Sequence, residues 1–435
     1  MTNERQMTQT QQLLAYIDSS PSPWHAVEST VALLQTHGFK ALSEKEAWQL
    51  NTRGRYYTIR DQSSIIAFVT GSKAPSESGY RIIGAHTDSP GLRIKPNPEQ
   101  KRGAYLRLGV EVYGSPILAT FADRDLSLAG RVSVKTGSGT QAFESRLLRI
   151  DESIVRLPNL AIHLNRDVNK SGLKFNTQDE LPLIFSQPDL DGGNFKGLVA
   201  KQLQVSEGDI LAWELAAYDT QPGAFFGLDQ AFITNSQLDN LASCHAALLT
   251  LTKTLDRANA ATQVIAFFDH EEVGSCSAKG ANGSFLNDVL NRISTTLDES
   301  PQGHHQAIAH SYMLSADMAH AWHPNFSNKH EPEHQPIINN GPVIKINTNQ
   351  RYTTDAHTEA LFVSICEDEK VPYQKFVNRS DLACGSTIGP MSAARTGIRS
   401  LDVGNPMWAM HSIRESAGAL DHDYMIRAMS GFLRC

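Results

Sequence analysis

Residues 264–275 read Val-Ile-Ala-Phe-Phe-Asp-His-Glu-Glu-Val-Gly-Ser, an apolar run followed at once by a cluster of acids. The apolar residues 264–268 are typical of a strand that is buried on both faces. Three carboxylic acids and a histidine occupy the next four positions, and Gly274 then allows the backbone to turn away. Adjacent carboxylates at the end of a buried strand are costly unless a cation neutralises them. We therefore expect a metal site here, and the alternative is a solvated acidic loop.

The same stretch does not encode a zincin helix, although His270 and Glu271 begin the pattern H-E-x-x-H. Position 274 is glycine, so the second histidine ligand of that pattern is missing. We interpret the two glutamates as having different tasks. Glu272 is expected to bind a metal, and Glu271 is expected to act as the general base on a water molecule.

Composition excludes several classes of protein. The chain has 435 residues, of which 40% are hydrophobic and 20% charged, as in an ordinary globular protein. The net charge of −7 and the absence of a basic block argue against a nucleic-acid partner. No apolar run is long enough to span a membrane, and the polar amino terminus does not resemble an export signal. The five scattered cysteines form no zinc knuckle or disulfide framework, so we expect a cytoplasmic protein.

The pattern of strands and helices indicates two kinds of architecture in one chain. Apolar strands alternate with helices in residues 1–90 and 231–435, which predicts a three-layer α/β catalytic domain with a mostly parallel central sheet. Residues 91–230 are expected to form an inserted, β-rich domain, because 105–112 and 130–134 alternate with the period of two that strands with one wet face show. Within the insert, residues 165–196 are polar and too long for an ordinary loop, so we expect either a disordered segment or an arm that reaches outside its own domain.

Three apolar strands of the predicted catalytic domain end in metal-binding residue types. The strand 80–85 leads into His86, the strand 264–268 into the two glutamates, and the strand 312–316 into Asp317. Ligands gather outside the carboxyl ends of strands in open parallel sheets. Asp88 lies two residues after His86 and points the same way in an extended chain, either as a neighbour of the metal or as a partner of the imidazole. The alternative for this segment is a capped turn before Pro90.

The charges of the candidate ligands balance two divalent cations. Three carboxylates and one bridging hydroxide neutralise four positive charges, while the histidines bind as neutral ligands. Asp239 is the expected bridge between the metals. This mixed ligand set suits zinc, and also manganese or cobalt. The candidate ligands are His86, Asp239, Glu272, Asp317 and His411.

Seven segments together resemble the aspartyl aminopeptidases, a family of dinuclear-zinc aminopeptidases, and the resemblance covers nearly the whole chain. These segments are residues 84–91, 238–240, 268–275, 315–320, 349–352, 384–390 and 410–415. One departure is visible, because Ala383 stands where the family pattern has proline. It lies outside the ligand set, so it affects only the expectation for a local turn.

The resemblance implies the same five metal ligands, with Asp88 orienting His86 and Glu271 as the general base. It implies that the insert is a dimerisation domain and that the protein assembles as a tetrahedral dodecamer built from dimers. It also implies that His163 of the insert enters the active site of a neighbouring subunit.

The resemblance further implies a preference for amino-terminal Asp or Glu. Lys345 would then attract the substrate carboxylate, with Tyr352 as a hydrogen-bonding partner and His320 as a pocket residue; otherwise Lys345 is an ordinary strand lysine facing solvent. The metal chemistry alone leaves open a deacylase or carboxypeptidase on the same fold. A metal-stabilised scaffold without catalytic activity is a third hypothesis. Glu271 argues against this scaffold, because Glu271 has no structural role once Glu272 is the ligand.

Overall fold

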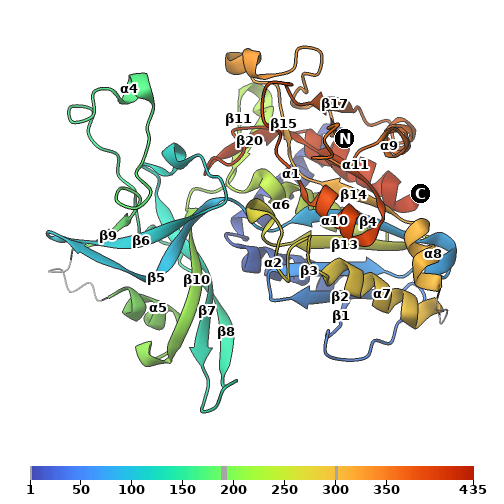
Figure 1. The fold of residues 1–435 in the computed structure, drawn as a ribbon, viewed down its shortest axis with the longest axis horizontal. Helices are drawn as coiled ribbons and strands as arrows, with labels where there is room; N and C mark the ends of the chain where they lie inside the picture. The colour runs from blue at the N-terminus through green and yellow to red at the C-terminus, as the bar shows by residue number, and fades with distance from the viewer. Residues whose placement is uncertain (1, 188–193, 299–301) are drawn as a thin grey trace.

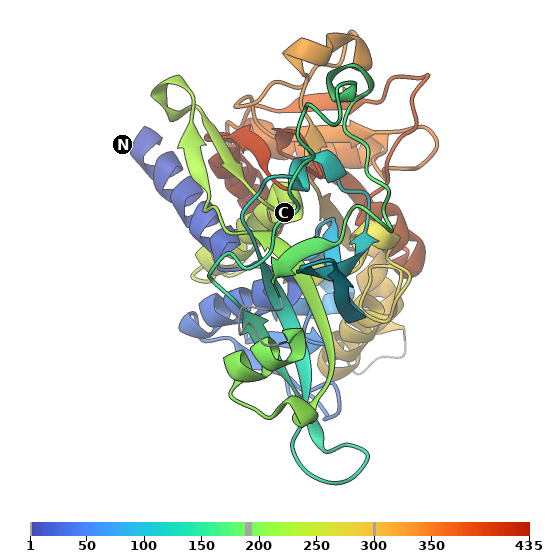
Figure 2. The ribbon, with the colours of Figure 1, turned by 90° about the vertical axis from the view of Figure 1, so that its left-hand side faces the viewer.

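The computed structural model describes residues 2–187, 194–298 and 302–435. Figure 1 shows an α/β body that holds both termini, and beside it a β-rich body formed by the green and cyan middle of the chain. Figure 2 shows the β-rich body from its outer side, with the α/β body behind it.

A nine-stranded sheet forms the centre of the α/β body, in the order β1-β2-β3-β13-β4-β14-β18-β16-β17. Five of its strand pairs are parallel and three are antiparallel. The four central strands β13, β4, β14 and β18 all run in one direction. The strands are β1 (Lys40–Ala41), β2 (Arg55–Arg60), β3 (Ser64–Val69), β4 (Tyr80–His86), β13 (Thr262–Phe268), β14 (Tyr312–Ala316), β16 (Val343–Ile346), β17 (Gln374–Val377) and β18 (Arg399–Gly404).

Both faces of this sheet are buried, which explains why its strands read as continuous apolar runs. Successive side chains of a strand point to opposite faces. In β13, Ile265 and Phe267 belong to one hydrophobic core, whereas Val264, Ala266 and Phe268 belong to the other. The sequence of a strand between two helical layers therefore carries no alternation of apolar and polar residues.

Two layers of helices cover the sheet. The first core contains side chains from α1 (Thr2–Asp18), α2 (Pro23–Thr36), α6 (Leu238–Lys253), α9 (Ala356–Asp368) and α11 (Asp421–Arg434). The second contains side chains from α7 (Phe285–Asp298), α8 (Gly303–Ala309) and α10 (Ile388–Thr396), with the short α3 (Pro75–Ser78) beside them. The predicted three-layer α/β arrangement with a mostly parallel sheet is confirmed.

The β-rich body is a six-stranded antiparallel sheet with its own core, in the order β8-β7-β10-β5-β6-β9. Its strands are β5 (Gly91–Arg102), β6 (Tyr105–Tyr113), β7 (Leu126–Lys135), β8 (Phe143–Arg149), β9 (Leu183–Ser186) and β10 (Ile210–Asp219), and its helices are α4 (Val168–Ser171) and α5 (Phe195–Leu203). We call residues 91–219 the inserted segment. Part of the predicted arm 165–196 belongs to this sheet, because β9 pairs with β6. Residues 188–193 of the arm lie outside the described part of the chain.

A third, five-stranded sheet lies next to the α/β body, in the order β11-β12-β20-β19-β15. Its strands are β11 (Ala224–Phe226), β12 (Phe232–Asn235), β15 (Ala319–His320), β19 (Pro406–Trp408) and β20 (Glu415–Gly418). β11 falls within the expected boundary 91–230, yet it pairs with β12 and not with the six-stranded sheet. The exact division into domains stays a prediction.

Candidate active site and metal centre

The candidate ligands come from five separate segments that meet at one edge of the nine-stranded sheet. His86 is the last residue of β4, Asp317 follows β14, and Glu272 lies in a single 3-10 turn after β13. Because β13, β4 and β14 are parallel neighbours, their carboxyl ends meet at the same edge. Asp239 lies at the start of α6, and His411 lies between β19 and β20.

Asp239 stands between two groups of ligand atoms. Its Oδ1 atom lies 3.4 Å from Nε2 of His86, which in turn lies 3.7 Å from Oδ1 of Asp317. Its Oδ2 atom lies 3.5 Å from Nε2 of His411, which lies 3.3 Å from Oε2 of Glu272. Each group therefore contains one histidine, one further carboxylate and one oxygen of Asp239.

These separations fit ligands of a small cation better than direct hydrogen bonds. A tetrahedral zinc site with bonds of about 2.1 Å separates neighbouring ligand atoms by roughly 3.4 Å. Two buried oxygens, Oδ1 of Asp239 and Oε1 of Glu272, have no hydrogen-bond partner among the described residues. Buried polar atoms are normally paired, so these two oxygens are suited to receive a metal ion.

The shifted pKa values in the cluster reflect burial together with the many carboxylates that lie close to one another. Burial lowers the pKa of His86, but contacts with Asp239, Asp317 and Asp88 outweigh burial and hold that pKa well above its usual value. Burial, with Asp239 next, raises the pKa of Glu272 well above its usual value. Burial also raises the pKa of Glu271, to about 8. Without a metal the cluster thus gathers protons, which a divalent cation would replace.

Asp88 holds the turn that carries the two glutamates. Its carboxylate accepts hydrogen bonds from the backbone N–H groups of Glu271 and Glu272, both at 3.1 Å, and from the hydroxyl of Tyr113 at 2.6 Å. The hydrogen-bond partner of His86 Nδ1 is the main-chain oxygen of Asp88 at 3.0 Å, whereas the nearest carboxylate oxygen lies 3.5 Å away. Asp88 therefore contacts His86 mainly through its backbone.

A cavity of about 520 Å³ opens beside this cluster and is lined by Glu271, His320, Lys345 and Tyr352, among others. Lys345 is only 3% exposed, so the expectation of an ordinary solvated lysine is wrong. Its Nζ atom lies 3.4 Å from Oδ2 of Asp317 and 5.4 Å from the centre of the Tyr352 ring. A positive charge is thus held at the wall of the cavity, next to a candidate metal ligand.

Comparison with known proteins shows the family of this chain. The family model described as aminopeptidase I zinc metalloprotease (M18) matches residues 16–433. A probable M18 family aminopeptidase 2 of Ectopseudomonas mendocina is 46% identical over 427 residues, which cover 97% of each chain. The corresponding protein of Pseudomonas aeruginosa is also 46% identical, over 429 residues and 97% of each chain. The chain belongs to the M18 family of zinc aminopeptidases.

Solved structures of M18 relatives share the whole fold. A chain from the cryo-EM structure of the Ape4 and Nbr1 complex superposes with a TM-score of 0.96 at 37% identity, covering 99% of this chain and 86% of that chain. A chain of the mApe1 dodecamer of S. cerevisiae superposes with a TM-score of 0.85 at 28% identity, covering 97% of this chain and 95% of that chain. The family resemblance noted in the sequence is therefore confirmed.

The structure of this M18 aminopeptidase does not bring every predicted residue to the cavity. His163 lies in an exposed turn and is not among the residues lining the cavity. Its apolar neighbours Leu160, Ile162 and Leu164 are 57%, 46% and 74% exposed. The turn is therefore an uncovered apolar surface in the single chain.

Two further residues of the site were missed in the sequence. Glu415 is buried, and its carboxylate accepts hydrogen bonds from the backbone N–H groups of Asp239 at 3.0 Å and His411 at 2.7 Å. The only signal for it was its place at the end of the segment 410–415. Tyr113, which holds Asp88, had no signal, because it ends an ordinary alternating strand of the inserted segment.

Among the described residues, no helix combines the length and apolar character that a membrane crossing requires. All five cysteines are unpaired.

Proposed function

We propose that this M18 aminopeptidase removes amino-terminal Asp or Glu residues from peptides at a site that holds two zinc ions. The observation that carries the proposal is the buried Lys345 in the cavity beside two ligand groups that share Asp239. Manganese or cobalt could occupy the same ligand set, because its mixture of imidazole and carboxylate groups suits all three metals.

His86, Asp239 and Asp317 would hold one ion, and Asp239, Glu272 and His411 the other. The ions, when bound, would polarise the scissile carbonyl and lower the pKa of the attacking water. The two otherwise unpaired oxygens in this set support the assignment.

Glu271 is the general base in this proposal. It lines the cavity but belongs to neither of the two groups that share Asp239. Its backbone N–H donates to Asp88, which fixes the main chain from which its side chain reaches the cavity. Glu271 would take a proton from the attacking water and give it to the leaving amine.

Lys345 gives the proposed preference for acidic residues. The buried ammonium group beside Asp317 can also pair with a carboxylate that enters the cavity, whereas an apolar side chain gains no such contact and a basic one is repelled. Tyr352, which is 4% exposed, and His320 would line the same part of the pocket.

We also propose that the chain assembles in the cytoplasm as a tetrahedral dodecamer built from dimers, with His163 serving a neighbouring subunit. The exposed apolar residues on both sides of His163 support burial of this turn in an assembly. The description of a relative as a dodecamer and the unpaired cysteines agree with this proposal.

A panel of chromogenic substrates tests the proposed function. We expect rapid release of amino-terminal Asp and Glu, slow release of Leu or Ala, and no cleavage of N-acylated or carboxyl-terminal substrates. A chelator should abolish activity, and zinc, cobalt or manganese should restore it. Preferential cleavage of N-acyl or carboxyl-terminal substrates would favour the deacylase or carboxypeptidase reading instead.

A further inference from the structure

The turn 269–275, which carries Glu271 and Glu272, contains only one short 3-10 turn, Glu271–Val273, as regular secondary structure. After β13 ends at Phe268, His270 and Ser275 adopt left-handed backbone angles, with φ of 66° and 60°. Residues other than glycine adopt this conformation only when surrounding contacts impose it. The contacts that hold the turn therefore decide where the two glutamates lie.

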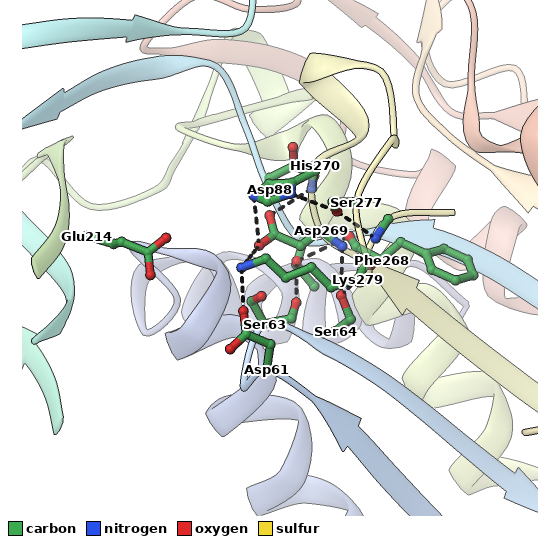
Figure 3. Close-up of polar contacts among 12 residues, drawn as sticks. Asp61, Ser63, Ser64, Asp88, Glu214, Phe268, Asp269, His270, Ser277 and Lys279 are labelled. Carbon is green, nitrogen blue, oxygen red and sulfur yellow. Dashed lines mark hydrogen bonds and ion pairs between the residues drawn. The ribbon is translucent and has the colours of Figure 1, made fainter. Parts of the chain in front are cut away.

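Asp269 anchors the start of the turn. It is fully buried, its backbone N–H donates to Oγ of Ser64 at 2.9 Å, and its Oδ1 accepts from the backbone N–H of His270 at 2.8 Å. Its Oδ2 lies 3.0 Å from Nζ of Lys279, a lysine that is only 5% exposed (Figure 3). Lys279 thus supplies the positive charge that a buried carboxylate requires.

Lys279 is in turn connected to the inserted segment. Its Nζ lies 3.2 Å from Oδ2 of Asp61, in the turn between β2 and β3. Asp61 accepts hydrogen bonds from both terminal nitrogens of Arg131 on β7, at 2.9 Å and 3.2 Å. Arg131 also donates to Glu214 on β10 at 2.6 Å. Five charges of alternating sign therefore run from the six-stranded sheet to the catalytic turn, and we call this series the Lys279 link.

The inserted segment also reaches the other side of the same turn. Tyr113, at the end of β6, donates to Asp88, and Asp88 accepts from the N–H groups of Glu271 and Glu272. Polar contacts therefore connect the inserted segment to the turn at two places, Asp88 and Asp269.

We propose that Arg131, Asp61 and Lys279 are positioning residues that transmit the orientation of the inserted segment to Glu271 and Glu272. This inference rests on the proposed roles of Glu271 as base and Glu272 as ligand. None of the three residues lines the cavity, so they act through the turn and not on the substrate. The inserted segment also carries the exposed turn around His163, which we expect to contact a neighbouring subunit. The Lys279 link therefore connects the segment that takes part in assembly with the turn that carries Glu271 and Glu272.

Arg131→Met is the first test, because methionine keeps a long unbranched side chain while removing the guanidinium group, whose central carbon lies 5.1 Å from the centre of the Trp24 ring. We expect kcat to fall about tenfold or more with KM changed less than twofold, as for a displaced catalytic group. Hydrogen–deuterium exchange of residues 268–275 should accelerate, and zinc affinity should weaken because Glu272 lies in the turn. Arg131→Lys should restore part of each loss.

Arg146→Met is the matched control, because Arg146 pairs with Glu144 inside the inserted segment and does not contact the turn. It should leave kcat and exchange unchanged. Asp61→Asn is the second variant in case Arg131→Met fails to fold, and the same changes are expected from it because Asp61 is a half-exposed turn residue.

Unchanged kcat and unchanged exchange in Arg131→Met and Asp61→Asn would overturn the inference. The exchange experiment needs no substrate, so it separates this inference from the proposed function. If wild-type protein cleaved no amino-terminal acidic residue, the proposed function would fail while accelerated exchange still supported the Lys279 link.

Discussion

Asp239 faces His86 with one carboxylate oxygen, at 3.4 Å, and His411 with the other, at 3.5 Å. The two histidines come from β4 and from the loop between β19 and β20, more than 300 residues apart in the chain. Glu415 accepts from the backbone N–H of Asp239 and from that of His411, so it fixes the bridging residue and one histidine together. This shared carboxylate is the basis for expecting two metal ions and not one.

Glu271→Gln should separate chemistry from metal binding. Glutamine keeps the size of the side chain but cannot accept a proton, so we expect kcat to fall at least ~100-fold. Zinc content, measured by elemental analysis, should remain that of the wild type. Near wild-type turnover in this variant would assign the general base elsewhere.

Lys345→Ala should change specificity. Loss of a buried charge partner costs about 2–5 kcal/mol, so kcat/KM should fall by about 30-fold or more for Asp and Glu substrates and far less for Leu or Ala substrates. Lys375→Ala is a suitable control, since Lys375 lies on the neighbouring strand β17 but pairs with Glu359 outside the cavity. Equal losses on all substrates would make Lys345 a general structural residue.

His25 should make the protein less stable in mild acid. Burial, helped by Arg149, lowers the pKa of His25 from 6.5 to about 4. The unfolded chain therefore binds this proton as the pH falls below 6.5, while the folded chain stays neutral until about pH 4. The free energy of unfolding contributed by His25 should be intact above pH 6.5 and should decrease by about 1.4 kcal/mol by pH 5.5.

His25→Asn tests this titration, because asparagine can still pair with the hydroxyl of Ser22, which lies 2.7 Å from Nδ1 of His25. Urea unfolding with a chelator present would exclude metal release as a cause. We expect wild type to lose more stability than the variant between pH 7.5 and 5.5. Parallel pH curves for the two proteins would show that His25 does not titrate in this way.

The exposed turn around His163 should be needed for assembly. Replacing Leu160, Ile162 and Leu164 together by serine removes the apolar surface that we expect a neighbour to cover, so light scattering should show smaller particles with lower activity. His163→Ala should lower activity without changing particle size. Full-sized particles from the triple variant, or full activity in His163→Ala, would contradict the corresponding role.

The residues of the site that directly follow a strand could be predicted from the sequence. His86, Asp317 and the two glutamates each follow an apolar run, and parallel strands necessarily bring such ends together. The α/β body and the β-rich insert could be distinguished from the pattern of their strands. A continuous apolar run indicates a strand that is buried on both faces, whereas an alternating run indicates a strand that is buried on one face.

The missed residues depend on contacts between segments with no local signal. Tyr113 reaches Asp88, and Arg131 reaches Asp61, only because the inserted sheet packs against the catalytic turn in one particular orientation. Lys279 follows the acidic stretch and reads as an ordinary loop lysine, although it is buried against Asp269. Periodicity within a segment cannot predict which side chain it meets across such an interface.

The most direct measurement is zinc-edge anomalous diffraction from crystals of the zinc-loaded protein. We expect two peaks roughly 3.5–4 Å apart, one beside His86 and Asp317, the other beside Glu272 and His411, with one oxygen of Asp239 on each. A single peak, or two peaks of which one does not contact Asp239, would contradict a two-metal site bridged by this residue.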